Sequence, residues 1–311
     1  MGEGWSLLRY SLAKGLCMIT LTHNPSAGTY DFETDEVSGS IQPQGAYHGV
    51  TRLTDRRTGR QVIHPKYSAL NLFRLFAVHQ GMGQPRLTPR RTEVHPAAVE
   101  IHWPATEAHQ GELTARYEVV EPNAVDLTVR LRCAGTYAGY ELFVSNYFDP
   151  ALVPHVYLKP NRFSRSTGEA DRVAPMVNDV FRGTVLVFPR DAHAARRCVD
   201  GRWDRSEWGD PTVQMCPVRH HAYPAAFVAD PEGRLGAALM SRPGDCTAIS
   251  TRYHAADEAD RMVAYSAFDF SLFGGDLTPG DERTVRVRLA LTPLDGGMTQ
   301  PLAMYRKFCE M

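Results

Sequence analysis

The chain has 311 residues, with 34 Lys and Arg against 35 Asp and Glu, and a formal net charge of −1. This balance excludes the basic surface with which proteins bind nucleic acid. Hydrophobic residues at 43% and charged residues at 22% exclude a disordered chain or a coiled coil. No apolar run approaches the roughly 18 residues of a membrane-spanning helix, so neither a nucleic-acid nor a membrane partner is expected.

The N-terminal segment resembles a signal peptide only weakly. Arg9 and Lys14 interrupt its apolar stretch, and no small-residue cleavage site follows. We therefore expect a poorly ordered leader over residues 1–17 and a single domain over residues 18–311, with a first strand near Met18–Thr22. Translation from Met1 and from Met18 are both left open.

The six cysteines form no CxxC pair and have no regular spacing. That pattern fits neither a zinc site nor a disulfide framework. The sequence thus favours reduced thiols in a cytoplasmic protein, with no metal and no cofactor.

Alternation of apolar and polar residues is the main structural signal along the chain. A period of two places one face of a strand in a core and the other toward solvent. Turn sequences rich in Pro, Gly, Asn and Asp separate these segments. The expected strands, in chain order, are Ala97–Trp103, Glu112–Val120, Ala124–Arg132, Thr184–Phe188, Ala222–Val228, Leu235–Met240, Met262–Phe270 and Glu282–Thr292.

Three further segments complete the predicted architecture. A hairpin is expected around Glu121–Asn123, and a helix over Thr299–Glu310, where Pro301 suits the first turn. The segment Asp149–Asp210 is interpreted as long loops with one strand. Closely spaced strands without long helical windows predict an all-β fold, a large antiparallel β-supersandwich with a short C-terminal helix.

Histidines are the first candidates for chemistry, because a neutral imidazole can donate or accept a proton near neutral pH. His220 and His221 are adjacent, and in a strand they would point to opposite faces. His221 is preferred as the catalytic acid, and His220 replaces it if the register is reversed. His48 and His155 are candidate substrate-binding residues. Each of these histidines can also be purely structural.

A second candidate region is Asp200–Asp210, which reads DGRWDRSEWGD. Indole rings can stack on the apolar face of a sugar while charged groups bind its hydroxyls. We take Trp203 and Trp208 as candidate sugar-binding residues, and Asp204 or Glu207 as the candidate catalytic base. One alternative is a solvated loop anchored by its two tryptophans, and another is that the carboxylates hold Ca²⁺ through their oxygen atoms, although their spacing is not that of an EF-hand.

The remaining candidates are polar residues in or beside apolar strands. Asn146, Tyr147 and Asp149 lie at the end of the segment Tyr140–Pro150, where an Asx turn before Pro150 is the alternative. Arg74 is a lone charge in an apolar run, which is costly unless it is paired or faces a ligand. Arg219 precedes the histidine pair. Asp149 is also the reserve choice for the base.

Three short segments resemble the galactose mutarotase-like superfamily, which includes the aldose 1-epimerases. The segment His48–Asp55 followed by Thr58-Gly59-Arg60 is similar to an early strand of these proteins. Val144–Phe148 resembles the strand with the motif Thr-Asn-His-x-Tyr-Phe-Asn. Ser271–Asp281 resembles the end of the sandwich, where Pro-Gly-Glu precedes the last long strand.

The resemblance implies a supersandwich that binds a sugar on one concave sheet. In mutarotases a glutamate removes the anomeric hydroxyl proton and a histidine protonates the ring oxygen. This chain departs from that pattern, because the motif histidine is absent at Asn146-Tyr147 and no late glutamate matches.

Two functions remain open from the sequence. The first is an isomerase of epimerase or mutarotase type that acts on a sugar or sugar acid by proton transfer. The second is a non-catalytic carbohydrate-binding or accessory subunit, or a sugar lyase or glycoside hydrolase on the same fold. The expected partner is a mono- or oligosaccharide, and the sequence does not indicate an oligomeric state. If all four candidate histidines lie outside the sugar groove, the binding function is favoured.

Overall fold

The computed structural model describes residues 19–78, 80–162, 164, 168–175, 185–199, 214–215, 219–254 and 263–311. These residues form three β-sheets and two α-helices. Their strands pair in antiparallel fashion, apart from one short parallel pairing. None of the helices in this part of the chain is long and apolar enough to cross a membrane. The all-β supersandwich predicted from the sequence is confirmed.

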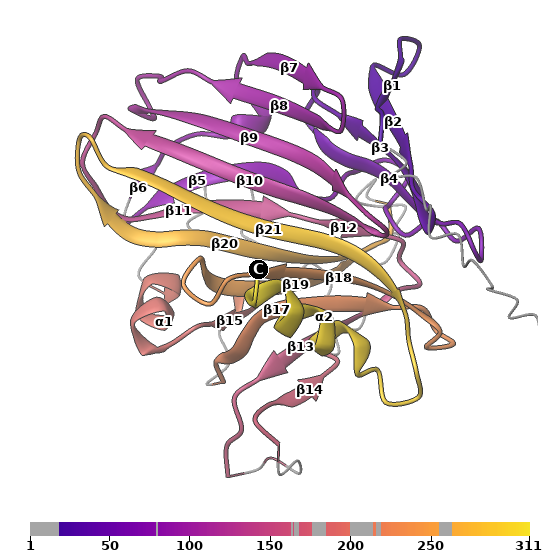
Figure 1. Ribbon diagram of the computed structural model, residues 1–311. Helices are drawn as coiled ribbons and strands as arrows, with labels where there is room; N and C mark the ends of the chain where they lie inside the picture. Colours follow the sequence, from indigo (N-terminus) through magenta and orange to yellow (C-terminus); the bar gives the residue numbers. More distant parts are fainter. Residues whose placement is uncertain are drawn as a thin grey trace, which may run out of the picture.

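A four-stranded sheet lies at one end of the molecule, at the right of Figure 1. Its order follows the sequence, and the expected first strand near Met18–Thr22 begins only at Thr22. Its strands are β1 (Thr22–Asn24), β2 (Thr29–Glu33), β3 (Val37–Gln42) and β4 (Gly49–Asp55).

A nine-stranded sheet has the order β14-β13-β17-β18-β21-β10-β9-β8-β7. The hairpin expected around Glu121–Asn123 joins β9 to β10, which pair from Val120↔Ala124 onward. The strands are β7 (Arg91–His95), β8 (Ala98–Trp103), β9 (Gly111–Val120), β10 (Ala124–Cys133), β13 (Val153–Leu158), β14 (Asp171–Val173), β17 (His221–Ala229), β18 (Leu235–Ser241) and β21 (Glu282–Pro293).

The third sheet is eight-stranded, with the order β16-β15-β19-β20-β11-β5-β6 and β12 paired to β20. Its strands are β5 (Asn71–Ala77), β6 (Gln80–Gly81), β11 (Tyr137–Ser145), β12 (Tyr147–Phe148), β15 (Val185–Pro189), β16 (Gln214–Met215), β19 (Cys246–His254) and β20 (Tyr265–Leu277).

The main core lies between the two large sheets, where alternate residues of facing strands meet. Phe268, Phe270 and Leu272 of β20 belong to the same buried cluster as Val125 and Leu127 of β10. The residues between them along β20, such as Asp269, therefore face the outer surface of the eight-stranded sheet. This outer surface carries the polar groups considered below.

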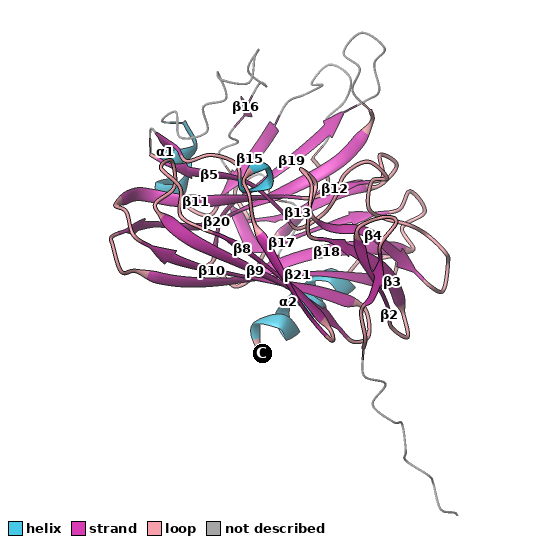
Figure 2. Ribbon diagram, turned by 90° about the horizontal axis from the view of Figure 1, so that it is seen from above, coloured by secondary structure: helices cyan, strands magenta, loops and turns pink. Residues whose placement is uncertain are grey.

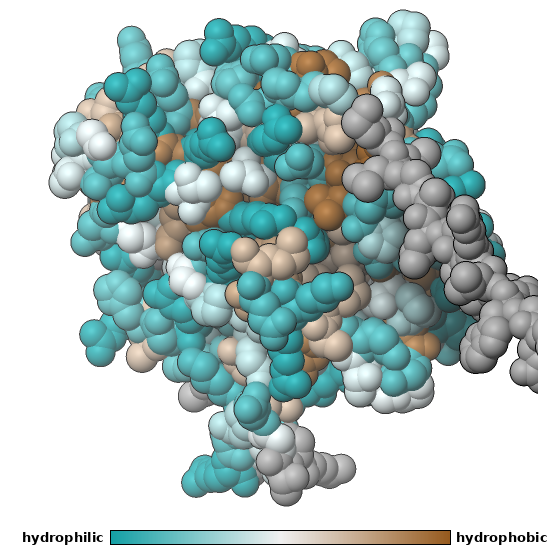
Figure 3. All heavy atoms as spheres, in the orientation of Figure 1, coloured by the Kyte–Doolittle hydropathy of each residue, from teal (hydrophilic) through white to brown (hydrophobic). Residues whose placement is uncertain are grey.

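The two helices lie on opposite sides of the sandwich (Figure 2). Helix α2 (Gln300–Cys309) confirms the expected C-terminal helix, and it buries Pro301, Tyr305 and Phe308 against the nine-stranded sheet. Around it the surface in Figure 3 shows apolar atoms, whereas most of this face is hydrophilic.

The interpretation of Asp149–Asp210 as loops with one strand is wrong for its described part. That part contains β13, β14, β15 and helix α1 (Ala192–Val199). Asp191 caps α1 by accepting the backbone N–H of Ala194 at 2.8 Å. Asp before an Ala- and Arg-rich segment is a helix-start signal, which the sequence analysis did not use.

Candidate functional site

Four tyrosines gather on the outer surface of the eight-stranded sheet, where it meets the four-stranded sheet. This tyrosine cluster consists of Tyr47, Tyr67, Tyr147 and Tyr265. The ring centroids of Tyr67 and Tyr147 lie 4.8 Å and 6.0 Å from that of Tyr47, and those of Tyr147 and Tyr265 are 5.1 Å apart. Tyr147 and Tyr265 are buried, whereas Tyr47 and Tyr67 are half-buried. The cluster therefore reaches the surface through Tyr47 and Tyr67.

A buried ion pair lies behind the tyrosines. Arg252 of β19 donates from Nε and Nη2 to the two carboxylate oxygens of Asp269, each at 2.8 Å. Ser250 Oγ and the backbone N–H of Asn146 also donate to this carboxylate. The Arg252 guanidinium carbon lies 5.2 Å from the ring centroid of Tyr147. Burial acts to lower the pKa of Arg252, but the charge of Asp269 outweighs it and raises the pKa well above its usual value.

His64 lies beside the tyrosine cluster and stacks on Tyr67 with ring centroids 4.6 Å apart. Its Nδ1 accepts the backbone N–H of Lys66 at 3.0 Å, which places the ring proton of the neutral form on Nε2. Burial lowers the pKa of His64, although a hydrogen bond to the backbone of Ala264 and the charge of Asp149 act in the opposite direction. At neutral pH the side chain is therefore an uncharged imidazole.

Asn146 and Tyr147 follow β11 directly, as the sequence indicated, but only Tyr147 joins the cluster. The Asn146 amide accepts from the backbone N–H of Leu70 and donates to the backbone oxygens of Val144 and Phe268. With these bonds it fixes the backbone that presents Tyr147. Asp149 forms the alternative Asx turn, because Oδ1 accepts the N–H of Ala151.

Arg74 is buried on the same outer surface, with its guanidinium carbon 4.9 Å from the ring centroid of Phe76. It lies opposite Phe143 of β11 in the strand register. Glu141, which lies on β11 with Phe143, is a fully buried carboxylate. It accepts hydrogen bonds from the hydroxyls of Thr247 and Ser271 at 2.9 Å and 2.6 Å. The outer surface of this sheet thus holds several buried charges among aromatic rings.

His48 and His155 lie elsewhere. His48 is fully buried, its Nε2 accepts the backbone N–H of Leu72 at 3.2 Å, and its ring lies 5.4 Å from that of Trp103. His155 stacks on Phe227 at 4.6 Å, and this ring belongs to the cluster beneath α2. Both histidines therefore have structural surroundings, away from the tyrosine cluster.

His220, His221 and Arg219 lie at the start of β17, on the nine-stranded sheet. Arg219 forms an ion pair with Asp171 and donates to the backbone oxygen of Lys159. His220 is half-buried, while His221 is 2% exposed. His221 lies on a different sheet from Asn146 and Tyr147, and its role as the catalytic acid stays a prediction.

Trp203, Asp204, Glu207 and Trp208 lie outside the described residues, as does the leader over residues 1–17. Their roles stay predictions. Among the described residues, those that the sequence analysis missed at the cluster are Tyr47, His64, Tyr67, Arg252, Tyr265 and Asp269.

The buried histidines predict a loss of stability in acid. Burial lowers the pKa of His221 to about 3, with the charge of Lys159 acting in the same direction, and burial lowers that of His109 to about 4. The unfolded chain binds these protons near pH 6.5. The stability gained by burying these two imidazoles in their neutral form is therefore fully present above pH 6.5. It is lost as the pH falls toward the pKa values of the folded state.

We expect the unfolding free energy, measured in urea at several pH values, to fall below pH 6.5. In a His221→Leu variant this slope should be smaller by up to about 1.4 kcal/mol per pH unit. An identical slope in the variant would show that His221 titrates normally in the folded chain.

Comparison with known proteins adds evidence on the fold. No protein-family model and no curated protein matches the chain. The structure is similar to that of a candidate aldose 1-epimerase from Escherichia coli K12, with 9% identity, a TM-score of 0.53, and coverage of 86% of this chain and 99% of that chain. It is also similar to a protein from Synechocystis sp. PCC 6803, with 13% identity, a TM-score of 0.52, and coverage of 85% and 95%. The chain therefore has the galactose mutarotase-like fold.

Proposed function

We propose that the chain binds a carbohydrate at the tyrosine cluster. The observation that carries this proposal is the meeting of Tyr47 and Tyr67, both half-buried, with buried Tyr147, Tyr265 and the Arg252–Asp269 pair. Tyrosine rings offer an apolar face for the C–H groups of a pyranose, and their hydroxyls bond to its hydroxyls. The similar structure described as a candidate aldose 1-epimerase is consistent with a sugar ligand.

Positive charge near the cluster favours a sugar with an acidic group. Arg86 is half-buried, and its guanidinium carbon lies 5.7 Å from the ring centroid of Tyr47 and 4.0 Å from that of Phe73. The Arg252 charge is already matched by Asp269. Arg86 therefore supplies the cation with which a sugar carboxylate would pair, since arginine binds carboxylates in bidentate fashion.

Binding without catalysis is the form of this function that the described residues favour. His48 and His155 lie away from the cluster, and His220 and His221 begin a strand of the other large sheet. Asp269 is fully buried and both of its carboxylate oxygens accept hydrogen bonds from Arg252, so neither oxygen is placed to take a proton from a sugar.

Proton-transfer chemistry on a sugar is the second candidate, and His64 is the observation that favours it. His64 is a neutral imidazole beside the cluster, and it stacks on Tyr67. General acid–base catalysis needs such a group within hydrogen-bond reach of the substrate. A His64→Gln variant separates the two functions. Isomerase activity that falls by about a hundredfold or more while sugar affinity is kept would support catalysis.

The binding proposal predicts that Tyr67→Ala weakens sugar affinity by about tenfold, which corresponds to about 1.4 kcal/mol. The reason is that Tyr67 is one of the two rings that reach the surface. The measurement is a titration by calorimetry, with neutral sugars and sugar acids as separate panels. An Arg86→Gln variant should lose affinity for the acidic panel more than for the neutral one.

The matched control is Tyr30→Ala. Tyr30 is also half-buried and also stacks on a ring, that of His23 at 5.0 Å, but it lies on β2 outside the cluster. Its replacement should leave sugar affinity unchanged. The proposal fails if both panels give no binding, or if both tyrosine variants bind like the wild type.

A further inference from the structure

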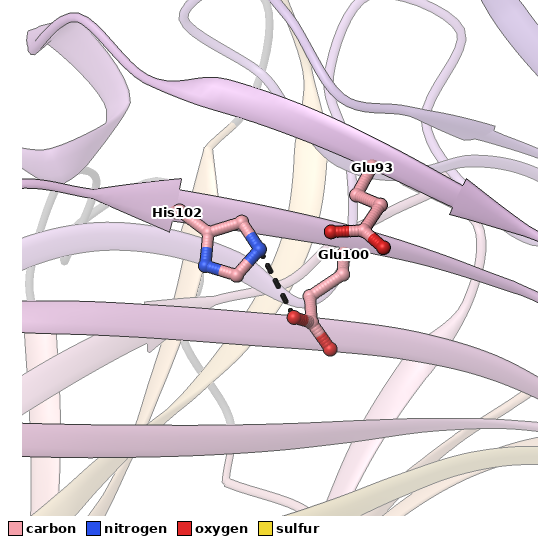
Figure 4. A group of neighbouring side chains, drawn as sticks. All are labelled: Glu93, Glu100 and His102. Atoms are coloured by element: carbon pink, nitrogen blue, oxygen red, sulfur yellow. Dashed lines mark ion pairs between the residues drawn. The ribbon is translucent and has the colours of Figure 1, made fainter.

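The outer surface of the nine-stranded sheet carries a group of side chains that can bind a metal ion. The group lies at the β7 end of the sheet, away from α2. Glu93 of β7 and Glu100 and His102 of β8 each offer a ligand atom, and these atoms lie within 4.8 Å of one another (Figure 4). Val99 and Ile101 of the same strand belong to the core, so Glu100 and His102 point outward. This face is the opposite side of the sandwich from the tyrosine cluster.

Strand register explains why the three side chains meet. Glu93 and Glu100 are direct partners in the antiparallel pair, and His102 lies two residues beyond Glu100 on the same face. Like charges directly opposite each other destabilise a sheet. A cation between the two carboxylates would remove this cost.

The imidazole is oriented for a ligand on Nε2. His102 Nδ1 lies 3.1 Å from the hydroxyl of Thr114, its direct partner on β9. His102 Nε2 lies 3.0 Å from Glu100 Oε1, so these two ligand atoms already face each other (Figure 4). A metal-ligating histidine normally has its second nitrogen fixed in this way by a hydrogen bond.

Two further side chains, Arg116 and His95, approach the carboxylates of the group. Arg116 approaches Glu100 at the other carboxylate oxygen, Oε2, at 3.9 Å, and it also pairs with Glu118 at 3.6 Å. His95 adjoins Glu93, with Nε2 3.7 Å from Oε1. A second imidazole nitrogen therefore adjoins the group.

We propose that Glu93, Glu100 and His102 form a binding site for a divalent transition-metal ion, with Zn²⁺ as the expected ion. One imidazole and two carboxylates are ligands that Zn²⁺ accepts, and three protein ligands leave a position for water. Calcium and magnesium fit less well, because they prefer six or more oxygen ligands. Thr114 is a positioning residue that holds the ring of His102.

The test is a calorimetric titration of the full chain with ZnSO₄ in a buffer that does not bind zinc. We expect a site whose affinity falls at least about tenfold in His102→Ala and in the shape-conserving Glu93→Gln. Thr114→Val, which removes only the hydroxyl contact, should weaken binding by about tenfold. Circular dichroism of each variant checks that it is folded.

The matched control is Glu118→Gln, which changes a neighbouring carboxylate that lies outside the group. It should leave zinc affinity unchanged. Co²⁺ gives a second readout, because its visible absorption bands report ligand number and should disappear in His102→Ala. Zinc affinity that is equal in the wild type, His102→Ala and Glu93→Gln would overturn the proposal, and would assign any bound zinc to other groups such as the cysteines.

Discussion

Asp269→Ala is expected to lower the free energy of unfolding by about 3–5 kcal/mol, because it leaves the Arg252 guanidinium buried without a counter-charge. The side chain of Asp269 is 0% exposed and that of Arg252 is 10% exposed, so water cannot compensate for the loss. Ser250 and the backbone N–H of Asn146 would also lose their acceptor. The measurement is equilibrium unfolding in urea.

The control for this prediction is Glu282→Gln. Glu282 pairs with Arg132 at 3.9 Å, but the two side chains are 76% and 72% exposed. Such exposed pairs contribute at most about 1 kcal/mol. Equal effects of the two substitutions would mean that the Arg252–Asp269 pair is open to solvent, and that no buried ion pair lies behind the tyrosine cluster.

Gly49→Ala should destabilise the fold by about 3 kcal/mol through two effects at the start of β4. Gly49 has a φ of +107°, which side-chain-bearing residues rarely adopt, and a Cβ here would lie 2.4 Å from the backbone oxygen of Ala69. That same oxygen accepts the N–H of Val50 at 2.9 Å, so it cannot move away freely. Strained backbone costs about 1–3 kcal/mol by itself, and the contact adds to it.

Gly59→Ala separates the two effects. Gly59 also has a positive φ, +71°, but a Cβ would meet no atom within 4 Å. The Gly59→Ala substitution should therefore lower the free energy of unfolding by about 1 kcal/mol, which is the cost of the backbone strain alone. If the two variants unfold at the same urea concentration, the close approach of the chain at Ala69 is absent in solution.

Much of the fold follows from alternation along single strands. Glu112–Val120 and Ala124–Arg132 predict β9 and β10 to within one residue at each end, because one face of each strand packs in the core and the other faces solvent. The described segment β13 was missed because both of its faces are largely buried and Pro154 interrupts the pattern.

The candidate site was harder to predict, because its residues come from separate segments. Tyr147 was found from its place at a strand end, but Tyr47 and Tyr67 lie in turns that carry no periodic signal. Arg252 and Asp269 did leave a signal. Asp269 stands between Phe268 and Phe270, as Arg74 stands between Phe73 and Leu75, and Arg252 lies on the strand that pairs with that of Asp269. Opposite lone charges on neighbouring strands indicate a buried ion pair.

The histidines show the limit of inference from residue type. His48 is a good proton-transfer residue by chemistry, but its nitrogen bonds to the Leu72 backbone inside the core. His221 begins its strand as expected, yet strand order places it on the nine-stranded sheet. Sheet membership depends on pairing between distant segments, which local periodicity does not encode.

A crystal structure of the chain grown with the sugar of highest affinity would locate the binding site. We expect a sugar ring packed against Tyr47 and Tyr67, with any acidic group toward Arg86. A sugar bound in an ordered way on another face, with the tyrosine cluster free of ligand, would contradict this expectation.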